Sequence, residues 1–228
     1  MAAMLKIGHR GAKGHVTENT LASFKKALAL GANAIELDVH VCATGELVVF
    51  HDFTVDRLTN RSGEVHQMTL TELKALTITG GHTIPTLDEV LQLLQGKCFI
   101  NIEMKGRHTA VPLAKLLAHY ITEKKYSYTR FIVSSFQYNE LEQLHALNPN
   151  VALGILTQAS IARAMDWALE FSAKAIHPHY SLLTQTNVKR AHDAGYKIYT
   201  WTVNEPEDIA RVQLYNVDGI ISDYPDRL

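Results

Sequence analysis

The chain has 228 residues, of which 46% are hydrophobic, and its formal net charge is −1. This length is sufficient to bury a sizeable core, as one large domain or two small ones, and α/β barrels often have it. The near-neutral charge, without a long basic run or interleaved aromatic and basic residues, excludes nucleic acid as an expected partner.

The sequence also gives an expectation about cellular location. The N-terminal stretch "MAAMLKIGHRG" lacks the apolar segment and cleavage site of a secretion signal. No apolar run approaches the length of a membrane-spanning helix, so we expect no stable membrane insertion. The two cysteines, Cys42 and Cys98, do not suggest a disulfide scaffold and favour a reducing compartment. We therefore expect a cytoplasmic protein, and no pattern indicates its oligomeric state.

Short apolar, β-rich segments alternate with helix-length amphipathic segments from one end of the chain to the other. The predicted strands span residues 5–9, 34–41, 47–51, 98–105, 131–136, 151–157, 175–180, 197–203 and 219–223. The predicted helices span residues 19–31, 86–97, 110–125, 139–147, 161–172, 184–195 and 205–216. Such alternation predicts a parallel sheet whose strands are connected by helices.

The strand at 47–51 does not fit the alternation. Only "CATGE" separates it from the strand at 34–41, which leaves no room for a helical crossover, so the two form a hairpin or one extended strand. Eight strands remain, with one of the predicted helices in each connection between them, which predicts a TIM (β/α)8 barrel. Residues 52–84, rich in Thr and Gly with one short helical pattern at 70–76, form an insertion within a single domain over residues 1–228.

Three carboxylates lie on two predicted strands that are neighbours in the barrel. Glu36 and Asp38 share one face of their strand because side chains alternate, and Glu103 lies on the next strand of the ring. Burying three unpaired carboxylates close together is costly. A hard divalent cation removes that cost, and Mg²⁺ and Ca²⁺ both prefer oxygen ligands.

Cationic and titratable side chains gather at the same ends of the strands, where barrels place their active sites. His9 and Arg10 end the first strand, His51 ends the hairpin strand, and Lys105 follows Glu103 at strand spacing. A cation site, two histidines, Arg and Lys around one cavity suit phosphoryl chemistry, with one histidine as base and the other as acid.

Taken singly, each of these residues has an ordinary structural explanation. A lone E-x-D on a strand is more often a polar layer satisfied by a salt bridge to Lys105 or Arg10. The convergence of all of them on neighbouring strand ends favours the functional interpretation. His40 shares the face of Glu36 but lies nearer the hairpin turn, and we interpret it as a rim residue or a partner of a site residue. His177 and His179 are interpreted as pocket lining.

The motifs that contain these residues resemble the glycerophosphodiester phosphodiesterase family. The resemblance covers residues 7–226 and rests on "GHRGAKGHVTENTLASFKKALALGANAIELDVHVCATGELVVFHDFTVDRLTNRSG", "INIEMK", "SSF", "WTVN" and "VDGIISDYP". Two departures concern loops: Thr17 replaces a proline before E-N-T and is expected to help cap the first helix, and Thr44-Gly45 replaces D-G in the hairpin turn.

The resemblance implies a TIM-barrel hydrolase that uses one divalent cation, Mg²⁺ or Ca²⁺. It would cleave small glycerophosphodiesters, such as glycerophosphocholine and glycerophosphoethanolamine, to glycerol 3-phosphate and an alcohol. The insertion at 52–84 would cover the substrate. The roles implied for single residues are cation binding by Glu36, Asp38 and Glu103, acid–base catalysis by His9 and His51, phosphate binding by Arg10 and Lys105, and glycerol contact by Trp201.

By the same resemblance, a glycerol hydroxyl would attack phosphorus in the first step to give a cyclic phosphate, with His9 as base and His51 as acid. Hydrolysis of lysophospholipids to lysophosphatidic acids is the alternative within the enzyme class. We rank it second because an exposed apolar rim around residues 52–84 would favour it, and that insertion is mostly polar. A non-catalytic barrel that binds phosphorylated ligands is a third reading, which predicts a missing histidine or carboxylate, and all are present. The alcohol headgroup is not specified by any motif.

Overall fold

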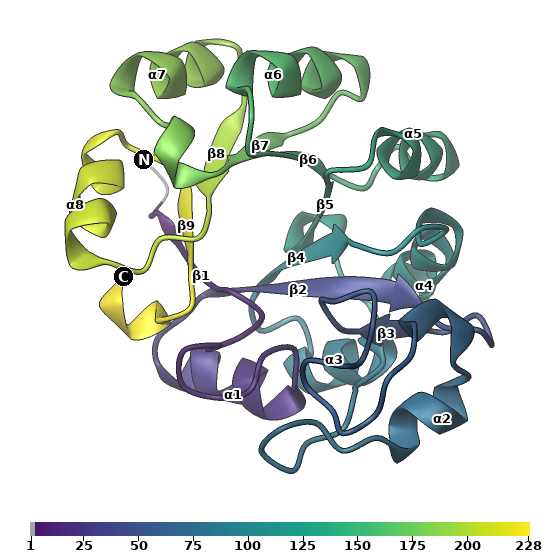
Figure 1. The fold of residues 1–228 in the computed structure, drawn as a ribbon. Coiled ribbons are helices and arrows are strands. Elements are labelled where there is room, and N and C mark those ends of the chain that lie inside the picture. Colours follow the sequence, from purple (N-terminus) through teal and green to yellow (C-terminus); the bar gives the residue numbers. More distant parts are fainter. Residues whose placement is uncertain (1–2) are drawn as a thin grey trace.

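Eight parallel strands form a closed ring in the computed structural model, which describes residues 3–228 (Figure 1). The ring is complete because β1 pairs in parallel with both β2 and β9. This arrangement confirms the predicted TIM barrel. In ring order the strands are β1 (Leu5–Gly8), β2 (Ala34–Val41), β4 (Phe99–Met104), β5 (Phe131–Ser135), β6 (Leu153–Thr157), β7 (Ala175–Pro178), β8 (Lys197–Thr200) and β9 (Gly219–Ser222).

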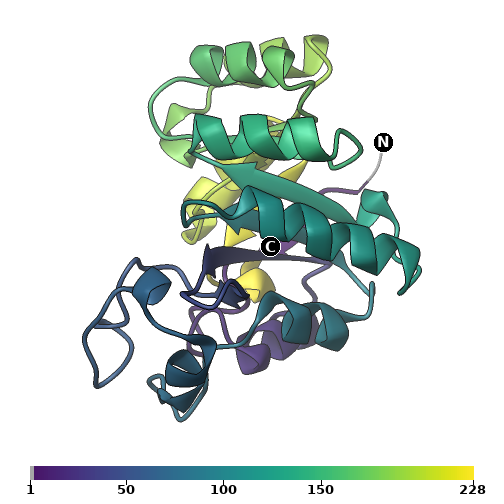
Figure 2. The ribbon, with the colours of Figure 1, turned by 90° about the vertical axis from the view of Figure 1, so that its right-hand side faces the viewer.

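Helices pack on the outside of the ring and connect its strands (Figures 1 and 2). Many begin at a threonine or serine whose side chain accepts a hydrogen bond from the first turn, as Thr20 does from the Ser23 amide. Capping boxes begin at Thr69, Thr86 and Thr184. The α-helices are α1 (Leu21–Ala29), α2 (Leu70–Ala75), α3 (Leu87–Leu94), α4 (Ala110–Thr122), α5 (Tyr138–Leu147), α6 (Ile161–Glu170), α7 (Gln185–Asp193) and α8 (Pro206–Leu214).

The ninth strand, β3 (Leu47–Val49), lies outside the ring and pairs antiparallel with the end of β2. This confirms the hairpin predicted from the five-residue connection. The insertion that follows contains a short 3₁₀ helix, η1 (Val65–Gln67), and α2, and projects from one side of the barrel (blue in Figure 2). Its buried apolar residues, among them Val55, Val65 and Ile78, form a cluster with Val48 and Phe50, separate from the main core.

The strand register determines which side chains meet inside the ring. Side chains that point outward, such as Ile35 and Leu37, pack against the helices in the main core. Side chains that point inward alternate with them, and the parallel pairing of β2 with β4 places Asp38 beside Glu103 and Glu36 beside Asn101. The acidic residues of β2 therefore face the interior at the end of the barrel where active sites form.

Three smaller expectations have different outcomes. Thr17 does not cap α1, because Thr20 does; the Thr17 hydroxyl instead donates to the Thr79 carbonyl in the insertion. His177 does not line the central cavity but is fully buried inside the barrel, where burial lowers its pKa to about 3. Within residues 3–228, no helix combines the length and apolar character needed to cross a bilayer.

Candidate active site

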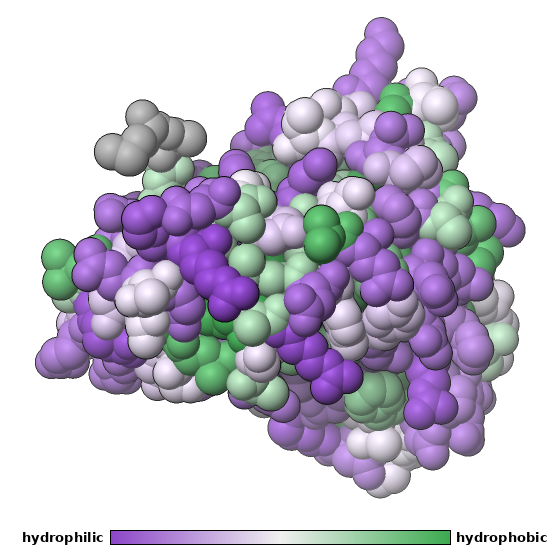
Figure 3. All heavy atoms as spheres, turned by 90° about the horizontal axis from the view of Figure 1, so that it is seen from above, coloured by the Kyte–Doolittle hydropathy of each residue, from purple (hydrophilic) through white to green (hydrophobic). Residues whose placement is uncertain are grey.

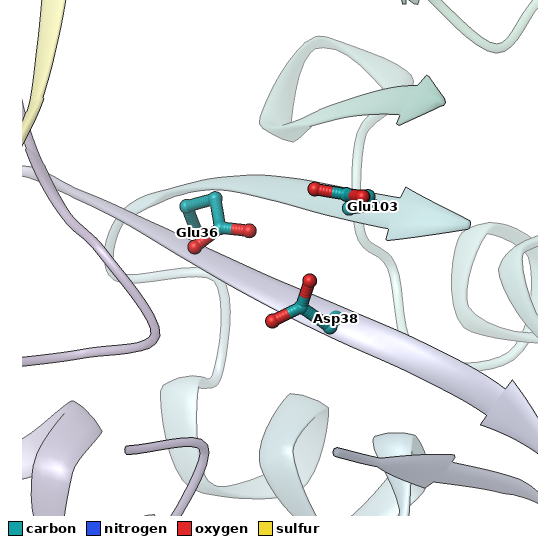
Figure 4. Close-up of side chains that lie close together, drawn as sticks. All are labelled: Glu36, Asp38 and Glu103. Carbon is teal, nitrogen blue, oxygen red and sulfur yellow. The ribbon is translucent and has the colours of Figure 1, made fainter. Parts of the chain in front are cut away.

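The three carboxylates predicted to bind a cation converge inside the barrel (Figure 4). Glu36 and Asp38 come from β2 and Glu103 from β4, and an oxygen of each lies within 4.8 Å of an oxygen of both others. All three are buried, with 9% exposure at most for Glu103. The register of two adjacent strands, rather than a loop, therefore fixes the relative positions of these oxygens.

The electrostatics of this cluster show the cost of assembling it. Burial, followed by repulsion from Asp38 and Glu103, raises the pKa of Glu36 well above its usual value. Burial and the charge of Asp38 raise the pKa of Glu103 to about 7, although Lys105 opposes this shift with its Nζ 3.1 Å from Oε1. A divalent cation bound among these oxygens would offset the repulsion. The donor set thus fits Mg²⁺ or Ca²⁺.

Arg10 connects the first strand to this cluster through a strained turn. Its backbone is left-handed (φ 50°), which is unfavourable for a residue with a Cβ atom, and Gly11 follows at φ 88°. In this conformation the Arg10 amide donates to Glu36 Oε2 at 2.8 Å. The guanidinium donates to Glu18 Oε1 at 2.7 Å, and its Nε lies 3.4 Å from Asp38 Oδ2.

His9 is held by a carboxylate from the opposite end of the chain. Its Nδ1 lies 2.6 Å from Oδ1 of Asp223, a residue that directly follows β9. Burial raises the pKa of Asp223, but bonds from His9 and Asn204 bring it to about 2. An ionised carboxylate only accepts hydrogen bonds, so His9 Nδ1 carries the proton and Nε2 has the free lone pair. Burial lowers the pKa of His9, with the Asp223 bond opposing it.

His51 has a similar arrangement, built from residues of the hairpin and insertion. Its Nδ1 lies 2.7 Å from Oδ1 of Asp52. The guanidinium of Arg57 joins that carboxylate, through Nε at 2.5 Å from Oδ2, to buried Glu18, through Nη2 at 2.7 Å from Oε1. His40 is also buried, and its Nε2 lies 3.1 Å from the His51 carbonyl oxygen. The sequence left His40 as either a rim residue or a partner of a site residue, and this contact with His51 favours the second interpretation.

A cavity of about 370 Å³ joins these groups at the centre of the barrel. One side is polar and the other, which includes Trp201, is apolar. The Trp201 ring packs edge-to-face on Phe136 at 5.6 Å, and its Nε1 donates to the His177 carbonyl. Asp38 lies beside the cavity, 1% exposed. The lining residues are His9, Arg10, Glu36, His51, Asn101, Glu103, Lys105, Phe136, Leu156, Gln158, Trp201, Thr202 and Ile221.

The structure adds several residues that sequence reasoning did not assign to the site: Asp223, Asn204, Glu18, Arg57 and Phe136. A signal existed for Asp223, since it follows the last strand of the barrel just as His9 follows the first. No sequence spacing pointed to Arg57, because its two carboxylate partners, Asp52 and Glu18, belong to different segments of the chain.

Comparison with known proteins agrees with the family resemblance of the sequence motifs. The model of the "Glycerophosphoryl diester phosphodiesterase family" matches residues 9–227. A protein of Caldanaerobacter subterraneus subsp. tengcongensis named glycerophosphodiester phosphodiesterase is 39% identical over 237 residues, covering 98% of this chain and 96% of its own length. A protein of the same name from Bacillus altitudinis is 36% identical over 241 residues, with the same coverage.

Solved structures of similar fold include a phosphodiesterase from Oleispira antarctica in complex with the product sn-glycerol-3-phosphate. It superposes with a TM-score of 0.89 at 28% identity, over 97% of this chain and 93% of its own. Because the family model spans nearly the whole barrel, together with the segments that carry His9, His51 and the carboxylate cluster, this chain belongs to the glycerophosphoryl diester phosphodiesterase family.

Proposed function

We propose that this protein hydrolyses small glycerophosphodiesters to glycerol 3-phosphate and an alcohol. The observation that carries the proposal is one cavity with a buried carboxylate cluster and two histidines, each hydrogen-bonded to a carboxylate of its own. Family membership supports it, as do the names of the relatives and the sn-glycerol-3-phosphate bound to the Oleispira antarctica enzyme.

Glu36, Asp38 and Glu103 would hold one divalent cation, Mg²⁺ or Ca²⁺. When bound, such a cation supplies positive charge that stabilises the phosphate oxygens as the reaction proceeds. Arg10 and Lys105 would add two cationic side chains on the same side of the cavity. The apolar side, where Trp201 contacts Phe136, would receive the carbon atoms of glycerol.

His9 would act as the base in the first step, because its Nε2 is free to accept a proton. It takes the proton of the glycerol 2-hydroxyl while that oxygen bonds to phosphorus, and His51 gives a proton to the leaving alcohol as the P–O bond breaks. The cyclic phosphate is then opened by water, with His51 as base and His9 as acid. Asp52 and Asp223 keep both imidazoles oriented throughout.

The insertion at 52–84 would cover the bound substrate, since Arg57 already brings it into contact with the site at Asp52 and Glu18. We also propose that the protein acts in the cytoplasm on a soluble substrate. The unpaired, buried thiols of Cys42 and Cys98 are compatible with a reducing compartment.

Phosphorus NMR of the purified protein with glycerophosphocholine tests the proposal. Glycerol 3-phosphate is expected with Mg²⁺ or Ca²⁺ and is expected to be lost with EDTA. His9→Ala and His51→Ala are each expected to abolish turnover without changing the circular dichroism spectrum. If no glycerol 3-phosphate forms with either cation, the proposed function is wrong.

A further inference from the structure

An outer cavity of about 390 Å³ lies next to the central one, at the ends of β2 and β4. Residues 40–41 at the end of β2, residues 106–108 after β4 and three side chains of the insertion line it. Among residues 3–228, the central and outer cavities share no lining residue. The outer cavity is therefore a separate space that the proposed mechanism does not use.

The outer cavity lies on the side of the site where the leaving alcohol is expected. His51 and Lys105 line the central cavity. Phe53 and Gly106, which follow them by two positions and one position in the chain, line the outer cavity. In the proposed reaction His51 gives a proton to the leaving alcohol, so the headgroup extends past His51. The glycerol side, with Trp201 after β8, lies across the barrel, because β8 is four strands from β4 in either direction round the ring.

The buried side chain of His40 presents an unpaired acceptor to the outer cavity. It is 2% exposed, and its Nε2 donates to the His51 carbonyl oxygen at 3.1 Å. Because a carbonyl oxygen only accepts, the lone pair of the neutral ring is on Nδ1. Nδ1 faces Gly106, where a Cβ atom would lie 2.8 Å away, and it has no hydrogen-bond partner within residues 3–228. A buried acceptor without a partner costs free energy, so a ligand that brings a donor is favoured there.

Two opposite charges also line the outer cavity. Hydrophilic side chains cover much of the molecular surface, as the face formed by α6 and α7 shows (Figure 3), and a single exposed charge indicates little. Arg107 and Glu64 differ because both line one cavity. Arg107 forms no salt bridge within residues 3–228, and the carboxylate of Glu64 has His66, two positions along the chain, as its partner at 3.2 Å. The ring of Phe53, 5.2 Å from that of His40, adds an apolar wall. The cavity thus offers a guanidinium, a carboxylate and a buried acceptor to one ligand.

We propose that the outer cavity binds the alcohol part of the substrate and prefers serine. The ammonium group of glycerophosphoserine donates to His40 Nδ1 and to Glu64, and its carboxylate pairs with Arg107. Ethanolamine offers the ammonium group alone, and choline has neither an N–H donor nor a carboxylate. The inference deepens the proposed function, on which it rests, by specifying the headgroup that no sequence motif specifies.

The test compares kcat/KM for glycerophosphoserine, glycerophosphoethanolamine and glycerophosphocholine at one free Mg²⁺ concentration, with glycerol 3-phosphate measured by phosphorus NMR. The serine ester is expected to have the highest value and the choline ester the lowest. Arg107→Gln should lower the serine-to-ethanolamine ratio by about two- to fivefold and leave the ethanolamine-to-choline ratio unchanged. Glu64→Gln should lower the ethanolamine-to-choline ratio by about two- to fivefold and leave the other ratio unchanged. Comparing ratios between variants cancels the intrinsic reactivity of each alcohol.

Arg61→Gln and Glu142→Gln remove the same charges from exposed positions outside the outer cavity, and both ratios should stay at their wild-type values. A wild-type enzyme that hydrolyses the choline ester most efficiently, an unchanged ratio in either Arg107→Gln or Glu64→Gln, or equal falls in the control variants would each overturn the inference. Each of these results would leave the proposed function standing. If none of the three substrates gave glycerol 3-phosphate, both would be overturned.

Discussion

Replacing Asp223 by asparagine should abolish catalysis by moving one proton on the imidazole of His9. The side chain of Asn204 has a fixed orientation, because its Oδ1 accepts from the Asp223 amide at 2.9 Å and from the Ser222 hydroxyl at 3.1 Å. Its amide nitrogen therefore donates to Asp223 Oδ2 at 2.9 Å. The other carboxylate oxygen, Oδ1, accepts from His9 Nδ1 at 2.6 Å.

In Asp223→Asn, the new amide has one oxygen and one nitrogen to satisfy the same two neighbours. Asn204 presents a donor, so the new carbonyl oxygen turns toward it and the new NH₂ group turns toward His9. His9 Nδ1 must then accept, which moves the ring proton to Nε2 and removes the lone pair that the base requires. The corresponding change in serine proteases lowers kcat about 10⁴-fold, which is about 5.5 kcal/mol of barrier.

The assay is kcat for glycerophosphocholine, with the His9 tautomer measured by nitrogen NMR. Asp223→Ala should lose less kcat than Asp223→Asn, because the His9 ring then keeps access to both tautomers. Asp226→Asn is the matched control, since Asp226 contacts His15 Nε2 at 2.7 Å in an exposed pair near the C-terminus. The reasoning is refuted if Asp223→Asn stays within tenfold of the wild-type kcat, or if its His9 ring is protonated on Nδ1.

Three further predictions concern stability. Without a cation, the free energy of unfolding should fall by about 3 kcal/mol as pH rises from about 4.5 to 7, because native Glu103 keeps its proton up to a pKa of about 7 while the unfolded chain loses it earlier. Mg²⁺ should therefore raise Tm more at pH 8 than at pH 5, and an equal rise at both pH values would contradict this prediction. Arg57→Gln should lower the free energy of unfolding by about 1–2 kcal/mol in urea titrations and should lower kcat, because the bond to Glu18 is lost; the loss is modest because the Arg57 side chain is 47% exposed. An unchanged urea midpoint and an unchanged kcat would contradict this prediction. Gly11→Ala should lower the free energy of unfolding by about 2–4 kcal/mol in thermal unfolding, because φ is +88° and a Cβ atom would lie 2.6 Å from the backbone carbonyl carbon of Ser23. An unchanged Tm would instead show that the turn can shift to accommodate the methyl group.

Much of the fold was predictable because local patterns decide it. Alternating strand and helix segments predicted the barrel, and a connection too short for a helix predicted that β3 pairs antiparallel with β2. Period two placed Glu36 and Asp38 on one face, and the adjacency of β2 and β4 brought Glu103 to them. Each step needed only neighbouring residues or neighbouring strands.

The remaining parts of the site depend on contacts that no local pattern encodes. Asp223 meets His9 only because the ring closes between β9 and β1, which joins residues 214 positions apart. Arg57 meets Glu18 because the insertion folds back over the first loop of the barrel. His177 and Glu36 both read as polar residues on strands, yet only the packing of the ring shows which of them is sealed inside and which faces the cavity.

The position of β3 outside the ring gives this protein two levels of cooperativity. Asp52 and Arg57 belong to the insertion, and His51 joins it to β3. The apolar cluster of the insertion is separate from the core that supports the barrel, whereas Leu47 and Val49 of β3 belong to that core. Local opening of the insertion therefore disconnects the proposed acid while the ring and its carboxylate cluster persist. On heating, we expect inactivation to precede global unfolding, and amides of residues 52–84 to exchange their hydrogens faster than those of β2 and β4.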